Sequence, residues 1–188
     1  MMQTAEQLRF SAADFLAWEE SQAEKHEFVA GEVFAMTGAR QDHVIVSLNI
    51  ASALKRRLRG TPCRAYIADM KLRVETADAF FYPDVMVSCH PEDRQAKQYL
   101  SHPTLIVEVL SESTANYDRG GKFVAYRKLD SLKEYLVVDI DNRLVECFRR
   151  TADCDWLLHD YVGDVECQLT SLNLSLPLAE IFEDIEAA

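Results

Sequence analysis

One short, nearly uninterrupted apolar segment constrains the fold of this 188-residue chain more than any other feature. Residues 104–110 read TLIVEVL, and a run that is apolar at almost every position is typical of a central strand covered on both faces. A second such run, EYLVVDI at 134–140, follows a helical pattern. The strand, helix, strand order from 104 to 140 therefore predicts a right-handed crossover that joins two parallel strands.

The segments before this unit alternate between helical and extended patterns. Ser11 and Asp14 form a capping-box pattern that predicts a helix to about Ala23. HEFVAGEVFAM predicts a hairpin around Gly31. Apolar residues spaced by three and four then predict an amphipathic helix over about 41–59, namely Val44, Leu48, Ala51, Leu54 and Leu58.

Two β-rich stretches separate that helix from the central strand. CRAYIADMKLRV and FFYPDVMVS flank the polar ETADA, so we expect a hairpin or neighbouring strands. Residues 90–103, HPEDRQAKQYLSHP, are polar and irregular and predict a surface loop or a frayed helix.

The rest of the chain completes the domain. Thr114 is expected to cap a helix to about Leu129, with Phe123 and Tyr126 facing inward. Further strands are predicted up to Leu176, followed by a closing helix that starts at Pro177. These patterns predict an α/β (mixed α+β) fold in which helices flank a central mixed β-sheet, with residues 1–188 forming a single domain.

Composition limits the environment and the cysteine chemistry. No apolar run approaches the roughly 18 residues that cross a bilayer, and the amino terminus lacks a basic segment followed by an apolar one, so we expect a cytoplasmic protein without a membrane partner. The five cysteines include no C-x-x-C pair. An odd set of this kind argues against a disulfide framework and a structural zinc site, so we expect reduced packing residues.

Charge argues against a nucleic-acid partner without excluding one. The formal net charge is −11, whereas phosphate binding normally uses clusters of Lys and Arg. A local basic run does occur, formed by Lys55, Arg56, Arg57 and Arg59. It is interpreted either as a solvated helix end with cations near the carboxyl terminus or as a phosphate contact.

Glu108 is the first candidate for chemistry. A carboxylate among the apolar residues of 104–110 loses solvation worth several kcal/mol unless a cation or a set of donors compensates. Compensation comes either from a buried ion pair with Arg or Lys or from a metal ion.

Asp84 is the second candidate, and it follows Pro83 at the start of an extended segment. It is either a metal ligand or a turn aspartate that bonds nearby backbone. Together, the two carboxylates provide the hard oxygen ligands that Mg²⁺ prefers.

Lys122 is the third candidate. It falls about seven residues into the predicted helix, a rise of roughly 10 Å back along the sheet. The strand end and loop after Glu108 cover a similar distance, so the ammonium of Lys122 is expected roughly level with Glu108. There it could orient or deprotonate an attacking water and stabilise charge during phosphoryl transfer. The alternative is a solvated helix lysine. Tyr126, one turn further on, is more readily interpreted as a core residue than as a catalytic one.

Glu27 and His43 are accessory candidates. A glutamate beside a hairpin is usually solvated, and a histidine in the first turn of a helix is usually a surface or capping residue.

Several segments resemble the Uma two family of restriction-endonuclease-like proteins, a branch of the PD-(D/E)XK nuclease superfamily. The resemblance covers roughly residues 10 to 150 and rests on HEFVAGEVFAM, DHVIVSLNIASAL, FFYPDVMV, TLIVEVLSEST and YDRGGKFVAYRKLDSLKEYLVVD. It implies the restriction-endonuclease-like fold, with Asp84 as the aspartate of the PD motif and Glu108 as its second acid. It also implies that Glu27 and His43 contribute a metal ligand or a base.

This chain departs from the family pattern at two positions. In the superfamily motif a lysine follows the second acid by two residues, but this chain has Leu110 at that position. Lys122 matches the helical lysine of this branch, and that lysine replaces the motif lysine in space. Glu112 stands where the family usually has proline in its E-V-L-S-P-S-T segment, and this change removes no proposed ligand.

The resulting hypothesis is a Mg²⁺- or Mn²⁺-dependent endonuclease that hydrolyses phosphodiester bonds in DNA. A catalytically inactive nuclease-like scaffold that binds nucleic acid or forms oligomers is the alternative, favoured by the acidic net charge. A phosphohydrolase of small substrates is a third possibility. A homodimer is expected because many proteins pair by two-fold symmetry and duplex cleavage addresses two strands.

Overall fold

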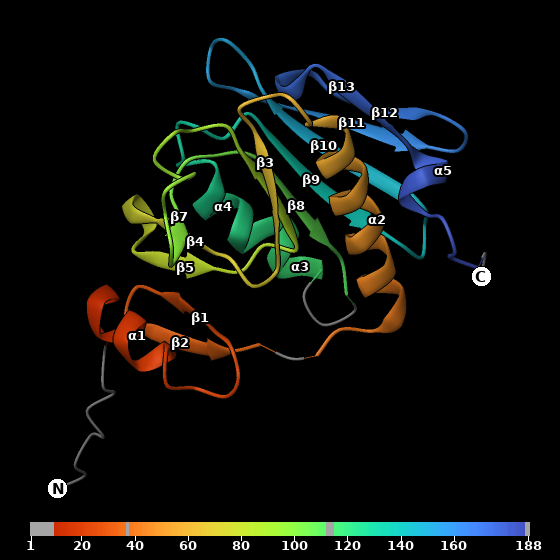
Figure 1. Cartoon of the computed structure of the whole chain (residues 1–188). Coiled ribbons are helices and arrows are strands. Elements are labelled where there is room, and N and C mark those ends of the chain that lie inside the picture. The colour runs from red at the N-terminus through yellow and green to blue at the C-terminus, as the bar shows by residue number, and fades with distance from the viewer. Residues whose placement is uncertain (1–9, 37, 112–114, 187–188) are drawn as a thin grey trace, which may run out of the picture.

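The computed structural model describes residues 10–36, 38–111 and 115–186 (Figure 1). The helices of these residues are α1 (Ala12–Glu19), α2 (Gln41–Arg57), α3 (Ala115–Tyr117), α4 (Phe123–Tyr126) and α5 (Leu178–Ile181), and a π-helical turn, Asp118–Lys122, joins α3 to α4. The strands are β1 (His26–Val29), β2 (Glu32–Ala35), β3 (Arg64–Ile67), β4 (Lys71–Val74), β5 (Ala79–Phe81), β6 (Val85–Ser88), β7 (Tyr99–Leu100), β8 (Pro103–Val109), β9 (Glu134–Asp139), β10 (Leu144–Arg150), β11 (Trp156–Val162), β12 (Glu166–Leu169) and β13 (Leu174–Pro177).

The larger sheet has six strands in the order β11-β10-β9-β8-β6-β3. β8 and β9 are parallel, as the strand, helix, strand pattern predicted, and the other neighbours are antiparallel. The expected mixed sheet is thus confirmed. Figure 1 shows α2 on one side of this sheet and α4 on the other.

Alternation along β8 explains why its sequence is apolar at almost every position. Leu105 and Val107 pack into the hydrophobic cluster that includes the buried face of α2. Ile106 packs into the cluster on the opposite face, which contains Tyr126 of α4. Because side chains of a strand point alternately to the two faces, both faces of β8 demand apolar residues, and Glu108 is the exception.

The second sheet has five strands in the order β2-β1-β5-β4-β7. Its β1–β2 hairpin turns through Ala30 and Gly31, which have φ angles of 49° and 94°. Consecutive positive φ values match the two-residue turns whose twist suits a hairpin, and glycine supplies one of them without strain. The predicted hairpin around Gly31 is confirmed.

The two β-rich stretches before the central strand are each divided between the two sheets. CRAYIADMKLRV forms β3 in the larger sheet and β4 in the smaller one, and FFYPDVMVS likewise forms β5 and β6. The expected pairing is confirmed twice, as β4 with β5 and as β3 with β6. Consequently Asp84 lies where the chain passes from one sheet to the other.

Three predicted helices differ in length from their observed counterparts. α1 ends at Glu19 rather than near Ala23, although its Ser11–Asp14 capping box is present. The helix after β8 ends at Tyr126 rather than near Leu129. Its predicted cap, Thr114, lies outside the described residues. α5 ends at Ile181, before the end of the predicted PLAEIFEDI helix, and it packs against α2.

The basic run at the end of α2 is divided: Lys55 and Arg59 are exposed, as expected for a solvated helix end, whereas the two arginines between them make ion pairs. Arg56 and Arg57 form ion pairs with Glu180 of α5, and Asn49 donates to the carbonyls of Ile181 and Glu183 at 3.2 and 2.9 Å. Half of the basic run therefore anchors the carboxyl-terminal segment to α2.

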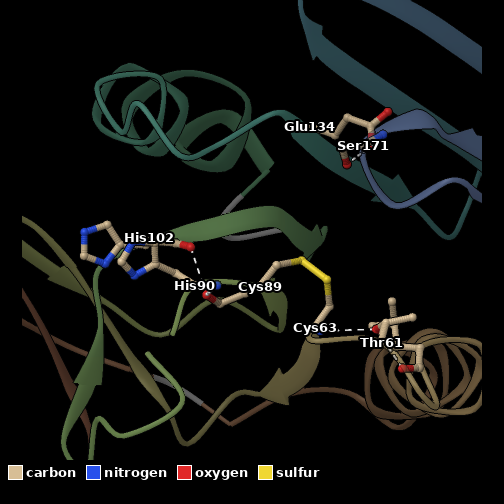
Figure 2. Close-up of a disulfide and its surroundings, with 9 residues drawn as sticks. Thr61, Cys63, Cys89, His90, His102, Glu134 and Ser171 are labelled. Atoms are coloured by element: carbon tan, nitrogen blue, oxygen red, sulfur yellow. Dashed lines mark hydrogen bonds between the residues drawn. A yellow bond between two sulfur atoms is a disulfide. The ribbon is translucent and has the colours of Figure 1, made fainter. Parts of the chain in front are cut away.

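The cysteine expectation was wrong for one pair. Cys63 and Cys89 form a disulfide (Figure 2), whereas Cys147 and Cys167 are free and buried and Cys154 is free and exposed. Cys63 precedes β3 and Cys89 follows β6, and the antiparallel register that pairs Arg64 with Ser88 brings the two cysteines opposite each other. A cross-strand disulfide needs no spacing motif, so cysteine counting could not detect it.

The segment 90–103, expected to be a surface loop or a frayed helix, is mostly turn, and it contributes β7, which pairs parallel to β4. Among the described residues, no helix is both long and apolar enough to cross a bilayer.

Candidate active site

Asp84 and Glu108 converge at one end of a pair of neighbouring strands. β6 and β8 are antiparallel, and Val85 lies opposite Val107, so the residue just before β6 lies beside the last residues of β8. The Val109 N–H donates to Asp84 Oδ2 at 2.8 Å. The two carboxylates therefore lie at the same end of this strand pair, and the charge of Asp84 acts on Glu108.

Glu108 is compensated by two donors from the following helix. Its Oε1 accepts hydrogen bonds from the Tyr126 hydroxyl at 2.7 Å and from Lys122 Nζ at 3.3 Å. Only 2 % of Glu108 is exposed. Burial raises the pKa of Glu108 well above its ordinary value, Lys122 offsets part of this effect, and the nearby Asp84 charge adds to it.

Lys122 is enclosed by carboxylates. Its Nζ lies 3.2 Å from Glu27 Oε1, 3.3 Å from Glu108 Oε1 and 3.2 Å from Asp118 Oδ1. Burial alone lowers the pKa of a lysine, but these acids and Asp84 raise it, and the net pKa lies well above the ordinary value. The ammonium is thus held in its charged form, and its predicted position level with Glu108 is confirmed.

The helix that carries Lys122 is not a regular α-helix. Residues 118–122, Asp-Arg-Gly-Gly-Lys, form a π-helical turn between α3 and α4, a feature that often occurs at functional sites. Asp118 and Lys122 both project from this turn into the buried cluster. Leu110, at the position of the superfamily's usual motif lysine, is buried in the hydrophobic cluster with Tyr126.

Glu27 reaches the cluster from the smaller sheet. It lies on β1, is buried, and accepts a hydrogen bond from the Tyr82 N–H at 3.4 Å. Burial raises the pKa of Glu27, although Lys122 and the Tyr82 N–H counteract the shift. The cluster therefore joins groups from both sheets and from the helix after β8.

His43 lies at the edge of the cluster. It belongs to the first turn of α2, and its Nε2 is 3.3 Å from Asp84 Oδ2. Burial lowers the pKa of His43, but the hydrogen bond and charge of Asp84 raise it further, so the net shift is upward. Asp84 therefore favours the protonated form of the imidazole.

A pocket opens next to His43. It is lined by two basic residues, by acids, and by the ends of β8 and β9, namely Arg40, Asp42, His43, Leu110, Ser111, Ala115, Arg119, Asp139, Ile140 and Asp141. Arg119 forms ion pairs with Asp139 at 3.1 Å and with Glu146 at 2.7 Å. The pocket provides solvent access on the His43 side of Asp84.

Asp118 belongs to the cluster, although it was not among the residues predicted from the sequence. It is buried, with 2 % exposed, and its backbone carbonyl accepts a hydrogen bond from the Tyr135 hydroxyl at 2.9 Å. Its spacing of four residues from Lys122 is the usual signal of an ion pair on a helix. That signal was present, but aspartate–lysine pairs of this spacing are also common on exposed helix faces.

The donor set fits a hard divalent cation. Four carboxylates, those of Glu27, Asp84, Glu108 and Asp118, act on the single ammonium of Lys122, which leaves a formal excess of three negative charges. Within the described residues, Asp84 Oδ1 and Glu108 Oε2 make no hydrogen bond, whereas the other oxygen of each carboxylate is engaged. Carboxylate oxygens without donors are suitable ligands for Mg²⁺.

A family model described as "Uma2: Putative restriction endonuclease" matches residues 12–181. The chain belongs to the Uma2 family. The resemblance noted in the sequence is confirmed, and it extends beyond residue 150 to include the carboxyl-terminal strands and all of α5.

Relatives and a solved structure support this assignment. Two uncharacterised proteins of Synechocystis sp., slr1290 and sll1609, are each 34 % identical to the chain. The match with slr1290 covers 94 % of this chain and 93 % of slr1290. The match with sll1609 covers 87 % of this chain and 94 % of sll1609. A crystal structure titled as a putative nuclease belonging to DUF820, from Anabaena variabilis, has a TM-score of 0.77 at 16 % identity, and the match covers 92 % of this chain and 97 % of that one. The predicted restriction-endonuclease-like fold is confirmed by this match.

Proposed function

We propose that this Uma2 protein is a Mg²⁺- or Mn²⁺-dependent endonuclease that hydrolyses phosphodiester bonds in DNA, with Asp84 and Glu108 as the metal ligands. The observation that carries the proposal is that Asp84 and Glu108, at one end of β6 and β8, each keep one carboxylate oxygen without a hydrogen bond among the described residues, beside a buried cluster with an excess of negative charge. A cation at this position would offset the cost of burying the carboxylates.

Each side chain of the cluster has a proposed role. Bound Mg²⁺ would lower the pKa of a coordinated water and neutralise charge on the phosphoryl oxygens. Lys122 holds Glu108 in place and adds positive charge where negative charge develops. Because an ammonium has three N–H groups and Lys122 has three carboxylate neighbours, it can orient an attacking water only when one of these contacts opens.

Tyr126 and Glu27 position these groups. The Tyr126 hydroxyl fixes one oxygen of Glu108 and leaves the other for a ligand. Glu27 contacts Lys122 from the opposite sheet and restricts its movement. His43, beside Asp84 and the pocket, is suited to give a proton to the leaving oxygen or to take one from water.

The pocket beside His43 is the proposed entry point for the phosphate. Arg40 and Arg119 line it, and guanidinium groups suit the geometry of phosphate oxygens. Asp139 and Glu146 both form ion pairs with Arg119, so the net positive charge at this entrance is low. We therefore expect binding of DNA that is weak and only shallowly dependent on salt concentration, because few cations contact phosphate.

Cleavage assays test this proposal. Plasmid and single-stranded DNA are incubated with the wild-type protein and Mg²⁺ or Mn²⁺, and with the Asp84→Ala and Glu108→Ala variants. The expected loss in each variant is on the order of 100- to 1,000-fold, and a chelator should abolish wild-type activity. Glu75→Ala, which changes an exposed acid on the turn after β4, is the matched control. Undiminished cleavage by either site variant would exclude this site.

A catalytically inactive scaffold is the second candidate. It is favoured by the net charge of −11 and by the use of Arg56 and Arg57 in holding Glu180. Calorimetry separates the two candidates, because a scaffold would show no Mg²⁺ or Mn²⁺ binding that depends on Asp84 and Glu108. We further propose a homodimer, since duplex cleavage addresses two strands, and light scattering of the purified chain measures its mass.

A further inference from the structure

A second group of ligand-type side chains lies at the opposite end of the same strand pair. His90 follows β6 and His102 precedes β8, so the antiparallel pairing that gathers Asp84 and Glu108 at one end gathers the two histidines at the other. Their rings are stacked, with centroids 4.0 Å apart and planes at 21° (Figure 2). Six residues of extended chain separate His102 from Glu108, roughly 20 Å at about 3.3 Å per residue.

The backbone around the two histidines is fixed by a buried serine. The Ser88 hydroxyl accepts from the His90 N–H at 3.2 Å and donates to the His102 carbonyl at 2.9 Å. Ser88 is 1 % exposed. One side chain thus ties both histidines together, and their proximity does not depend on the conformation of the loop between them.

A buried carboxylate orients one of the rings. Asp93, 3 % exposed, accepts from the N–H groups of Ser101 and His102 at 3.0 Å each. Its Oδ1 also lies 3.4 Å from His102 Nδ1. A carboxylate on one ring nitrogen fixes the tautomer and leaves the other nitrogen as an acceptor, the arrangement found behind most metal-binding histidines.

We propose that His90, Glu92 and His102 bind a divalent transition-metal ion of the Zn²⁺ class, separately from the acidic cluster. Each residue offers one ligand atom, and these atoms all lie within 4.8 Å of one another. Tetrahedral Zn²⁺ with ligands at about 2.0–2.1 Å needs separations of about 3.3 Å, so binding requires the stacked side chains to rotate. Imidazole nitrogens with one carboxylate suit Zn²⁺, and not Mg²⁺.

The partial exposure of this group suits an ion that exchanges with solvent. His90 and His102 are half-buried and Glu92 is exposed. Three protein ligands leave a fourth position for water. The ion would close the connection between β6 and β8 next to the Cys63–Cys89 disulfide, which ties the same end of β6 to β3.

Zinc titration of the full chain tests the proposal. The protein is prepared without a histidine tag, and excess Mg²⁺ is present. Its disulfide is kept intact, because a free Cys89 thiolate would add a soft ligand. Competition with a chromophoric chelator should give one Zn²⁺ per chain, and Co²⁺ should give the visible absorption of a four-coordinate site. His90→Ala, His102→Ala and Glu92→Gln should each weaken Zn²⁺ binding by about tenfold or more.

Two controls decide the outcome. His159→Ala removes an exposed histidine of β11 and should leave Zn²⁺ affinity unchanged. If the histidine variants fail to fold, Glu92→Gln decides, because Glu92 is exposed. Unchanged affinity in Glu92→Gln and in the folded histidine variants, or loss of the Zn²⁺ site in Asp84→Ala, would overturn the proposal.

Discussion

The two ends of the β6–β8 strand pair hold side chains of opposite character. At one end, Asp84 and Glu108 join a cluster in which carboxylates outnumber the single ammonium of Lys122. At the other end, His90 and His102 are half-buried and Glu92 is exposed, so water can solvate all three. The same antiparallel pairing therefore builds a site that is costly without a cation and a site that the fold tolerates when it is empty.

Burial, rather than the identity of the ligands, sets how strongly each site depends on its partners. Glu108 is 2 % exposed, so loss of any partner leaves a charge in a medium of low polarity. Glu92 is exposed, so loss of its partner returns it to water. Four predictions test this contrast.

The largest effect on stability is expected for Lys122→Met. The substitution leaves Glu27, Glu108 and Asp118 without their shared cation, which should lower the free energy of unfolding by about 3–5 kcal/mol. Urea denaturation without divalent ions measures it. Lys128→Met, an exposed position in the turn after α4, is the control, and equal midpoints for the two variants would contradict the buried-cluster argument.

Ion binding should stabilise the two ends independently. Mg²⁺ or Zn²⁺ at about 100 times its Kd should each raise the free energy of unfolding by about 2.7 kcal/mol, and the effects should add because the sites are well separated. Thermal denaturation of Asp84→Ala should lose only the Mg²⁺ response, and Glu92→Gln only the Zn²⁺ response. Loss of both responses in one variant would show that the ends are coupled.

Tyr126→Phe should have a smaller effect. It removes the 2.7 Å hydrogen bond to Glu108 and leaves the ring in place, so the expected loss is about 1–3 kcal/mol. Chemical denaturation measures it against Tyr66→Phe on β3, whose hydroxyl makes no hydrogen bond within the part of the chain that the structure describes. A loss no greater than that of Tyr66→Phe would mean that Lys122 alone compensates Glu108.

The smallest effect is expected at Asp139, which lies in the pocket wall. Burial raises the pKa of Asp139, but hydrogen bonds from Asn142 and the Arg119 guanidinium lower it below the ordinary 3.8. Its contribution to stability is therefore complete above pH 3.8 and is lost as the pH falls through the lower folded-state pKa.

Asp139→Asn should accordingly cost less than about 1 kcal/mol at neutral pH and flatten the acid limb of the stability profile. Urea denaturation between pH 3 and 7 measures this, with the exposed Asp153→Asn as control. A profile that matches the wild type down to pH 3 would show that the Asn142 and Arg119 contacts contribute nothing.

Much of the acidic site was predictable because its signals are local. A carboxylate inside TLIVEVL must find compensation nearby, and the helix that follows the strand is the nearest source of a cation. Lys122 and Tyr126 of that helix do contact Glu108. Asp118 was missed because its spacing from Lys122 has the same form on buried and exposed helix faces, and only burial distinguishes the two.

The helical and extended segments, the parallel crossover and the need of Glu108 for a partner could be predicted from the sequence, because these follow from periodicity and desolvation within a few residues. The division of FFYPDVMVS between two sheets, the contact of Glu27 with Lys122 and the Cys63–Cys89 disulfide depend on the tertiary structure. It also placed His90 beside His102 through the pairing of β6 with β8. These contacts join segments far apart in the chain, and strand order and register, which set them, leave little local trace in a sequence.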